Sequence, residues 1–207
     1  MKEFIRNFKK QQTVGLLNIC SLSLGIMVAI VIGLWTINEL SFDRFHKNND
    51  RIYRTVLTAN LSGNPVQLGS TFRPFGDDAK EEFPVIEDMC RILIQKADVT
   101  IDDKLHQQIA SFVTDSNFFN FFTFSLKEGE SNQVLSSPDR MVISESAAKR
   151  FFFGQDAIGQ TIKFWGLDFA VSGIMYDMPK NSSIQAEFVF PMFGWYAENG
   201  WGIWTAI

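Results

Sequence analysis

The sequence is poor in the residues from which metal sites and disulfide frameworks are built. Its 207 residues include only two histidines and two cysteines. Neither His46 nor His106 has a cysteine or a pair of carboxylates at the spacing of a zinc site. Cys20 lies inside a long apolar run and Cys90 far beyond it, so a membrane crossed by that run would keep the two thiols apart. We therefore expect no metal site and no intrachain disulfide.

A catalytic constellation is also missing. Residues 154–161 have the spacing of a phosphate-binding loop, but Gln160 stands where the motif needs lysine. The glycines also follow an expected helix and precede an expected strand, which is the reverse of the order in a true loop of this kind. No G-x-S-x-G elbow surrounds Ser144. The acidic pairs at 77–78 and 102–103 lack the further oxygen ligands that calcium requires. We expect no enzyme activity and no cofactor.

Positive charge is scarce outside the first residues of the chain. The formal net charge is -4, and residues 1–38 hold four basic residues against one acidic residue, so the remainder carries a net charge of -7. An acidic domain is poorly suited to binding nucleic acid or an anionic lipid surface, because both repel it. The 21 phenylalanines instead indicate a folded domain with an apolar core.

The longest feature that is present is an uncharged apolar run from Val14 to Ile37. As a helix it would extend about 36 Å, which exceeds the ~30 Å of a bilayer's hydrocarbon core. A cleaved signal peptide would have a shorter apolar region and a small-residue cleavage site, and neither is found here. We predict a retained transmembrane helix over residues 13–38.

The charges that flank this run predict its orientation. Lys2, Arg6, Lys9 and Lys10 precede it with only one acidic residue among them, whereas the residues directly after it are polar or acidic. Positive flanks stay in the cytoplasm. We expect residues 1–12 to form an amphipathic cytoplasmic segment and residues 39–207 to lie outside the cytoplasm.

Small residues recur every fourth position within the run. Ser21, Gly25, Ala29 and Gly33 would therefore lie along one face of the helix. Side chains this small let two helices approach closely in lipid, where no hydrophobic force between helices remains. The spacing predicts a face that packs against a partner helix.

Beyond the apolar run, the patterns of hydrophobic residues predict an α+β domain. A strand at 52–59, a helix at 72–82 and a strand at 89–95 suggest a β-α-β unit, and residues 98–112 suggest a hairpin with its turn at 102–103. Further elements are expected as strands at 139–144 and 188–191, a helix from Ser144 to Arg150, and a hairpin over 161–173. The last residues, WYAENGWGIWTAI, do not resemble a domain end, so we interpret the sequence as the N-terminal portion of a longer protein.

Four stretches carry a family resemblance. These are ELSFDRFHKNNDRIYR after the apolar run, SFVTDSNFFNFFTFSLKEGE, MVISESAAKRFFFGQDAIGQTIKF, and FAVSGIMYDMPKNSSIQAEFVFPM. In this order they resemble the N-terminal region of FtsX-like ABC transporter permeases, and more narrowly the macrolide-exporter (MacB) type with its periplasmic core domain. The resemblance covers nearly the whole chain.

The resemblance implies a bacterial inner membrane protein with one transmembrane helix, followed by a two-lobed periplasmic α/β domain with β-α-β units. It places a membrane-proximal lobe at about 51–111 and 185–207 and an inserted lobe at about 112–184. It further implies a permease subunit for export or mechanotransmission, with a separate ABC ATPase subunit and a second permease copy or a homologous permease as partners. The alternative function is the ligand-sensing ectodomain of a membrane-anchored signalling receptor, which would use the same anchor and domain.

Overall fold

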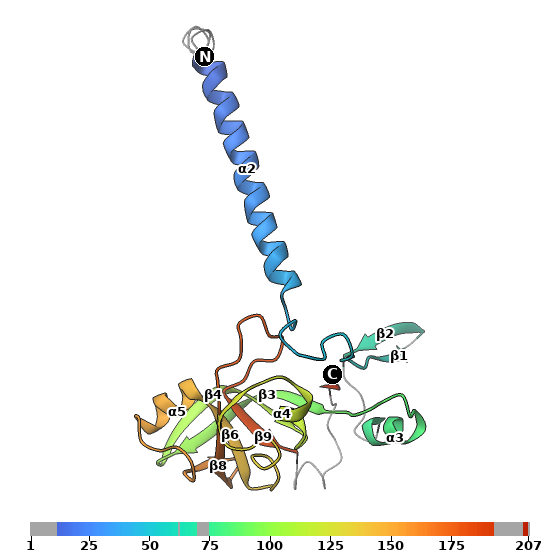
Figure 1. Cartoon of the computed structure of the whole chain (residues 1–207), viewed down its shortest axis with the longest axis vertical. Coiled ribbons are helices and arrows are strands. Elements are labelled where there is room, and N and C mark those ends of the chain that lie inside the picture. The colour runs from blue at the N-terminus through green and yellow to red at the C-terminus, as the bar shows by residue number, and fades with distance from the viewer. Residues whose placement is uncertain (1–11, 62, 70–74, 193–204, 207) are drawn as a thin grey trace. The chain divides into compact units, whose positions relative to one another are not determined.

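The computed structural model describes residues 12–61, 63–69, 75–192 and 205–206 of the chain. The chain divides into two units, Met1–Phe42 and Asp43–Ile207, which are described separately below. The first unit is built on one long helix, and the second, here called the head, mixes strands with short helices (Figure 1).

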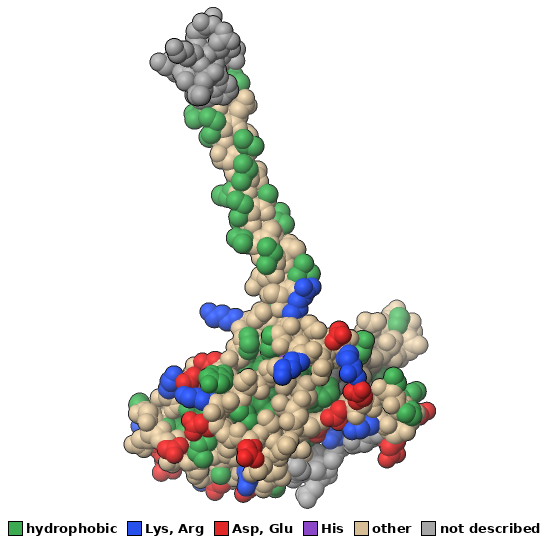
Figure 2. Space-filling model, viewed as in Figure 1, with side chains coloured by type: hydrophobic (Ala, Val, Ile, Leu, Met, Phe, Trp, Pro, Cys, Tyr) green, Lys and Arg blue, Asp and Glu red, His purple; other side chains and the backbone are tan. Residues whose placement is uncertain are grey.

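The first unit contains helix α2, which runs from Gln12 to Leu40. Its 29 residues span about 43 Å. Among the described residues, this is the one helix long and apolar enough to cross a membrane. Hydrophobic side chains lie along its surface, whereas charged side chains of both signs are scattered over the visible face of the head (Figure 2). The predicted transmembrane helix is confirmed as a helix, while residues 1–11 of the predicted amphipathic segment lie outside the described part of the chain.

The head contains ten described strands and three described helices. In chain order they are β1 (Leu57–Leu61), β2 (Asn64–Leu68), α3 (Phe75–Glu82), β3 (Arg91–Ile101), β4 (Lys104–Thr114), α4 (Phe118–Phe121), β5 (Leu126–Glu128), β6 (Arg140–Ser144), α5 (Glu145–Phe152), β7 (Thr161–Phe164), β8 (Leu167–Met175), β9 (Phe188–Pro191) and β10 (Thr205–Ala206). This mixed architecture confirms the predicted α+β class.

Six of these strands pair in a closed ring. Following the hydrogen bonds leads from β3 to β4, β9, β6, β8 and β7, and then back to β3. The β4–β9 and β6–β8 pairs are parallel, and the other four pairs are antiparallel. Because β6 and β8 are parallel and α5 lies between them in the chain, they form a β-α-β unit.

Residues alternate along the ring strands between two buried hydrophobic clusters. The inner cluster takes residues from all six strands and from α5, including Val99, Val113, Met141, Ile162, Phe169, Phe188 and Phe152. The outer cluster takes residues from five of these strands, all except β7, such as Phe112, Val142 and Val189. It joins them to Phe118, Phe122, Phe124, Leu135 and Ile184. The two-residue period of a strand therefore gives the sheet two apolar faces.

One predicted unit is wrong. The strand expected at 52–59 begins only at Leu57 and pairs with β2 in a separate two-stranded sheet, so it forms no β-α-β unit with β3. The connection between β1 and β2 is too short for a crossover, and Gly63 adopts a φ of 87° that favours a tight turn. The β-α-β pattern occurs instead at β6–α5–β8.

The other local predictions agree with the structure. The strand at 89–95 and the hairpin at 98–112 merge into one long hairpin, β3–β4, whose turn residues Asp102 and Asp103 have φ of 49° and 61°. Ser144 caps α5, since its Oγ accepts a hydrogen bond from the Ala147 N–H. The predicted lobe limits fall within β4 and shortly before β9, so both predicted lobes supply strands to one ring. The division into lobes stays a prediction.

Candidate functional site

The segment that follows the apolar helix is the candidate site, because it is where the helix joins the head along the chain. Residues 43–52, here called the exit segment, form turns with no regular helix or strand. Asp43 adopts a φ of 56°, in the left-handed region that aspartate tolerates better than most residues. The segment is held to the head at two places that are distant in the sequence.

Asp43 makes the first attachment, to the loop before β9. Its N–H donates to the Asn181 carbonyl oxygen at 2.9 Å. Its Oδ1 accepts from the Ser183 N–H at 2.9 Å and from the Ser182 hydroxyl at 3.3 Å. One residue therefore uses both its backbone and its carboxylate to hold the loop. Hydrogen bonds to a charged acceptor are stronger than neutral ones.

His46 makes the second attachment, to the phenylalanine-rich segment 118–124. Its Nδ1 accepts a hydrogen bond from the Thr123 N–H at 3.1 Å. The ring lies 5.3 Å from that of Phe122 and 5.1 Å from that of Phe124, and the side chain is only 5% exposed. Burial lowers the pKa of His46 from its ordinary value, and the nearby Asp43 carboxylate opposes this effect. The histidine is therefore held in its neutral form.

Neighbouring residues reinforce the second attachment. The Lys47 N–H donates to Thr123 Oγ1 at 2.9 Å, so Thr123 holds two consecutive residues of the exit segment. Phe45 and Ile52 pack against the outer cluster, and the rings of Phe45 and Phe124 lie 5.6 Å apart. The exit segment thus adds apolar contacts to the outer face of the ring strands.

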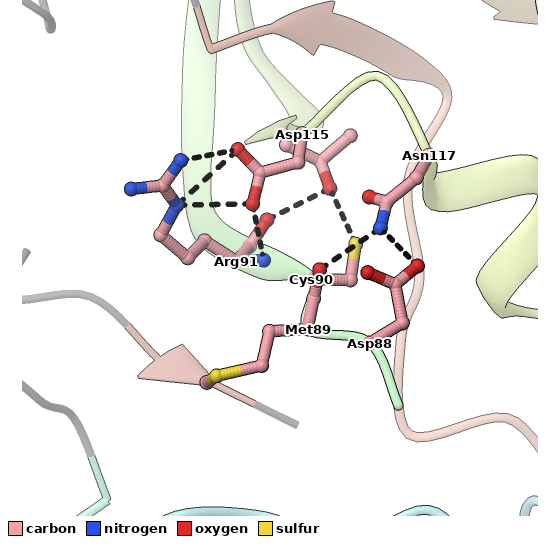
Figure 3. A network of polar contacts seen from close by, with 7 residues as sticks. Asp88, Met89, Cys90, Arg91, Asp115 and Asn117 are labelled. Carbon is pink, nitrogen blue, oxygen red and sulfur yellow. Dashed lines mark hydrogen bonds and ion pairs between the residues drawn. The ribbon is translucent and has the colours of Figure 1, made fainter. Parts of the chain in front are cut away.

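A polar network at the end of the β3–β4 hairpin borders the outer cluster (Figure 3). The guanidinium of Arg91 donates to both carboxylate oxygens of Asp115, with Nη2 2.8 Å from Oδ1, and the Arg91 N–H donates to Oδ2. The Thr114 hydroxyl donates to the Arg91 carbonyl oxygen at 2.8 Å. Cys90 lies 3.4 Å from Thr114 Oγ1, and burial raises the pKa of its thiol. This cysteine is a packing residue, as expected for a buried thiol.

Asn117 links the same network to the segment before β3. Its Nδ2 donates to Asp88 Oδ2 at 2.8 Å and to the Met89 carbonyl oxygen at 2.9 Å, as Figure 3 shows. Burial raises the pKa of Asp88, but hydrogen bonds from Lys80, Asn117 and the backbone outweigh it and lower the pKa below the ordinary value. The network therefore fixes the start of the phenylalanine-rich segment to which the exit segment attaches.

A cavity of about 250 Å³ lies beside the two attachments. Asp43, His46, Asn49, Ile52, Arg54, Phe122, Ser183 and Ile184 line it. Among the described residues no cluster of three or more metal-ligating side chains occurs. The cavity therefore borders both attachments of the exit segment, the one made by Asp43 and the one made by His46.

The residues predicted as a helix-packing face lie on α2. Ser21, Gly25, Ala29 and Gly33 share one side of that helix, and a Cβ atom built at either glycine would meet no described atom within 4 Å. Their packing role stays a prediction. The glycines of the near-motif at 154–161 have φ of 81° and 80° at the turn between α5 and β7, so they are turn residues as predicted.

Sequence reasoning did not select Asp43 or His46 as site residues. Both lie in ELSFDRFHKNNDRIYR, one of the stretches that carries the family resemblance. This resemblance was the one feature of the sequence that could have directed attention to them. Their partners are 77 and 140 positions away, so no local pattern shows them.

Residues 16–203 match the family model described as the MacB-like periplasmic core domain. A search of curated proteins finds no match.

Solved structures share the fold at low sequence identity. A domain of a Porphyromonas gingivalis protein named as a permease is 21% identical, with a TM-score of 0.59, over 69% of this chain and 64% of that domain. The periplasmic region of MacB from Actinobacillus actinomycetemcomitans is 17% identical, with a TM-score of 0.53, over 74% of this chain and 72% of that one. The extracellular domain of the ABC-type transporter YknZ from Gram-positive bacteria is 14% identical, with a TM-score of 0.57, over 75% and 80%.

Proposed function

The chain belongs to the family of MacB-like periplasmic core domains of ABC-transporter permeases, and from that premise we propose that it transmits ATP-driven motion from a separate ATPase subunit to its head. In this role the chain is the N-terminal part of a permease subunit. The head moves as the helix moves, for export or for mechanical control of a partner. The chemistry of ATP hydrolysis takes place on the partner ATPase.

The observation that carries this proposal is the double attachment of the exit segment. A free linker would absorb a displacement of the helix, because its residues could rearrange at little cost. Here Asp43 holds the loop before β9, and His46 with Lys47 holds Thr123. Both contacts bind the exit segment to parts of the chain that contribute to the outer cluster, and this cluster packs against the ring strands. A displacement of the exit segment is therefore passed to the sheet.

The second element of the proposal is a pair of permease helices. Ser21, Gly25, Ala29 and Gly33 form the face through which α2 packs against a helix of a second permease copy or of a homologous permease. Replacing Gly25 or Gly33 by leucine should separate the helices and abolish ATP-dependent movement, while membrane insertion continues because the helix becomes more apolar. Ile26→Leu and Ile30→Leu are matched controls off this face. Wild-type movement in both glycine variants would make the helix a simple tether.

Orientation is the third element. The basic residues Lys2, Arg6, Lys9 and Lys10 keep the N-terminus in the cytoplasm and put the head in the periplasm. A reporter that is active only in the periplasm, fused after Ser62, should be active. Activity of a cytoplasmic reporter at the same position would contradict this topology.

Head movement can be measured directly in the complex assembled with its ATPase. Lys163→Cys places a spin label on exposed β7, in a Cys20→Ala background, since Cys90 is fully buried. ATP should change the label distance between two permease copies. Asp43→Ala should suppress this change while ATP hydrolysis continues, and Asp50→Ala, in the same exposed turn region, should leave it intact. A wild-type complex whose label distance ignores ATP would refute the proposal.

A further inference from the structure

His46 holds the exit segment through an atom that is also a proton acceptor. A backbone N–H can only donate, so the bond from Thr123 requires a bare Nδ1, and the hydrogen of the neutral imidazole is then on Nε2. A second proton can only be added at Nδ1. The hydrogen bond from the Thr123 N–H and the protonation of His46 therefore exclude each other.

The surroundings make a charged imidazole costly in this position. Phe45, Phe122 and Phe124 surround the ring, and an aromatic environment cannot replace the water that solvates a cation. From these observations we infer that His46 is a proton-operated latch, which opens the second attachment of the exit segment in mildly acidic medium. The inference rests on the proposed mechanical function, because the latch is one of its two attachments.

Few charged groups face the ring. Asp43 and Arg54 share the cavity with His46, one negative and one positive. The phenylalanine-rich segment contributes Phe122 to the cavity, and the loop before β9 contributes Ser183 and Ile184, none of which titrates. On the exit segment itself, Arg44 and Lys47 are exposed. Asp43 is thus the carboxylate that can accept a hydrogen bond from a protonated His46. This bond would compete with the hydrogen bonds that Asp43 Oδ1 accepts from Ser182 and Ser183.

The direction of the pH effect follows from linkage. The pKa of latched His46 lies below its ordinary value, whereas a released and solvated histidine titrates near about 6.5. Below that pH the released state binds a proton that the latched state rejects. The ratio of released to latched chains therefore rises by up to about tenfold per pH unit until the latched pKa is reached. Above about pH 6.5 this ratio does not change with pH.

The test uses the full chain in lipid nanodiscs, with spin labels at Asn48→Cys on the exit segment and Lys163→Cys on β7, in the Cys20→Ala background. The distance distribution should be narrow at pH 7.5 and gain a longer, reversible component at pH 5.5. His46→Asn should stay narrow at both values, because the asparagine Oδ1 can accept from Thr123 N–H and does not titrate. His106→Asn, which alters the other, partly buried histidine, should behave as wild type.

A second variant keeps the inference testable if His46→Asn folds poorly. Asp43→Asn keeps an acceptor for Ser183 but removes the charge that raises the pKa of latched His46, so the longer component at pH 5.5 should be larger than in wild type. Identical wild-type distributions at both pH values, or a His46→Asn variant that responds like wild type, would overturn the latch. ATP-dependent head movement that persists in either case would leave the proposed function standing, so the two failures are distinguishable.

Discussion

The two hydrophobic clusters of the head share five ring strands but are built differently. The inner cluster consists of side chains from all six ring strands, from α5 and from Ala157 in the loop after it. The outer cluster combines strand residues with the phenylalanine-rich segment, the loop before β9 and, at its margin, Phe45 and Ile52 of the exit segment. The inner face therefore packs the ring strands and α5 against one another, whereas the outer face also holds the exit segment.

Polar groups sharpen this contrast. His46 and Thr114, both buried, lie on the outer side beside Phe122 and Cys90, and each has a hydrogen-bond partner there. The buried Ser111, which alternates with Phe112 along β4, instead donates to the Gln95 carbonyl oxygen within the β3–β4 hairpin itself. Directional bonds specify a unique arrangement, which apolar packing alone specifies less sharply. The outer face is therefore suited to hold the exit segment in one position.

The largest effect is expected for a truncation in the inner cluster. Phe188→Ala removes a fully buried ring that packs on Phe151 and Phe190, and it should lower the free energy of unfolding by about 3–5 kcal/mol. Denaturant unfolding of the full chain in detergent measures the loss. Phe153→Ala, which removes an 87% exposed ring, is the control. Equal losses in both variants would contradict the assignment of the inner cluster to the fold.

The next effect concerns the polar network that borders the outer cluster. Asp115→Ala removes the acceptor of the Arg91 side chain and of its N–H, and the expected loss is about 1.5–3 kcal/mol. The same unfolding experiment measures it. Asp168→Ala is the matched control, because its ion pair with Lys163 is exposed and 3.9 Å long. A loss no greater than that of the control would mean that solvent substitutes for the network.

A smaller effect is expected at the start of α5, on the inner side. Ser144→Ala removes the bond from the Ala147 N–H and should cost about 1 kcal/mol. Ser144→Thr keeps a hydroxyl at the cap and should lose less. Thermal unfolding followed by circular dichroism compares the two. If both variants melted together with wild type, the cap would contribute nothing to the inner face.

The smallest effect is expected on the solvent side of β7. Lys163→Ala breaks the exposed pair with Asp168, and surface changes of this kind stay within about 0.5 kcal/mol. The same melting experiment checks it. A larger loss would show that β7, which closes the ring, depends on its outer charges as well as on Ile162 and Phe164.

Local patterns in the sequence predicted much of the inner side. The strand ending at Ser144, the helix that Ser144 opens and the turn at Asp102–Asp103 each depend on neighbours within a few residues, and each agrees with the structure. Periodicity reports such local preferences well. The ring could not be predicted this way, because β9 lies between β4 and β6 only through long-range pairing.

The candidate site was less accessible to prediction for the same reason. His46 appeared as an isolated histidine, since its partner Thr123 is 77 positions away and contributes a backbone N–H that any residue other than proline would supply. Asp43 appeared as one acidic residue among several near the helix. Its role depends on a left-handed backbone and on a loop 140 positions away.

The place of β9 in the ring has a consequence for how the protein is made. This strand is central in space, but it is the last ring strand to leave the ribosome. Until residues 188–191 emerge, β4 and β6 each have an unpaired edge. Phe151 and Phe164 also lack their contacts with Phe188 and Phe190. Late closure of long-range pairs makes folding slow and exposes nascent chains to aggregation. The interval before β9 arrives is therefore the stage of synthesis at which the head is most exposed to aggregation.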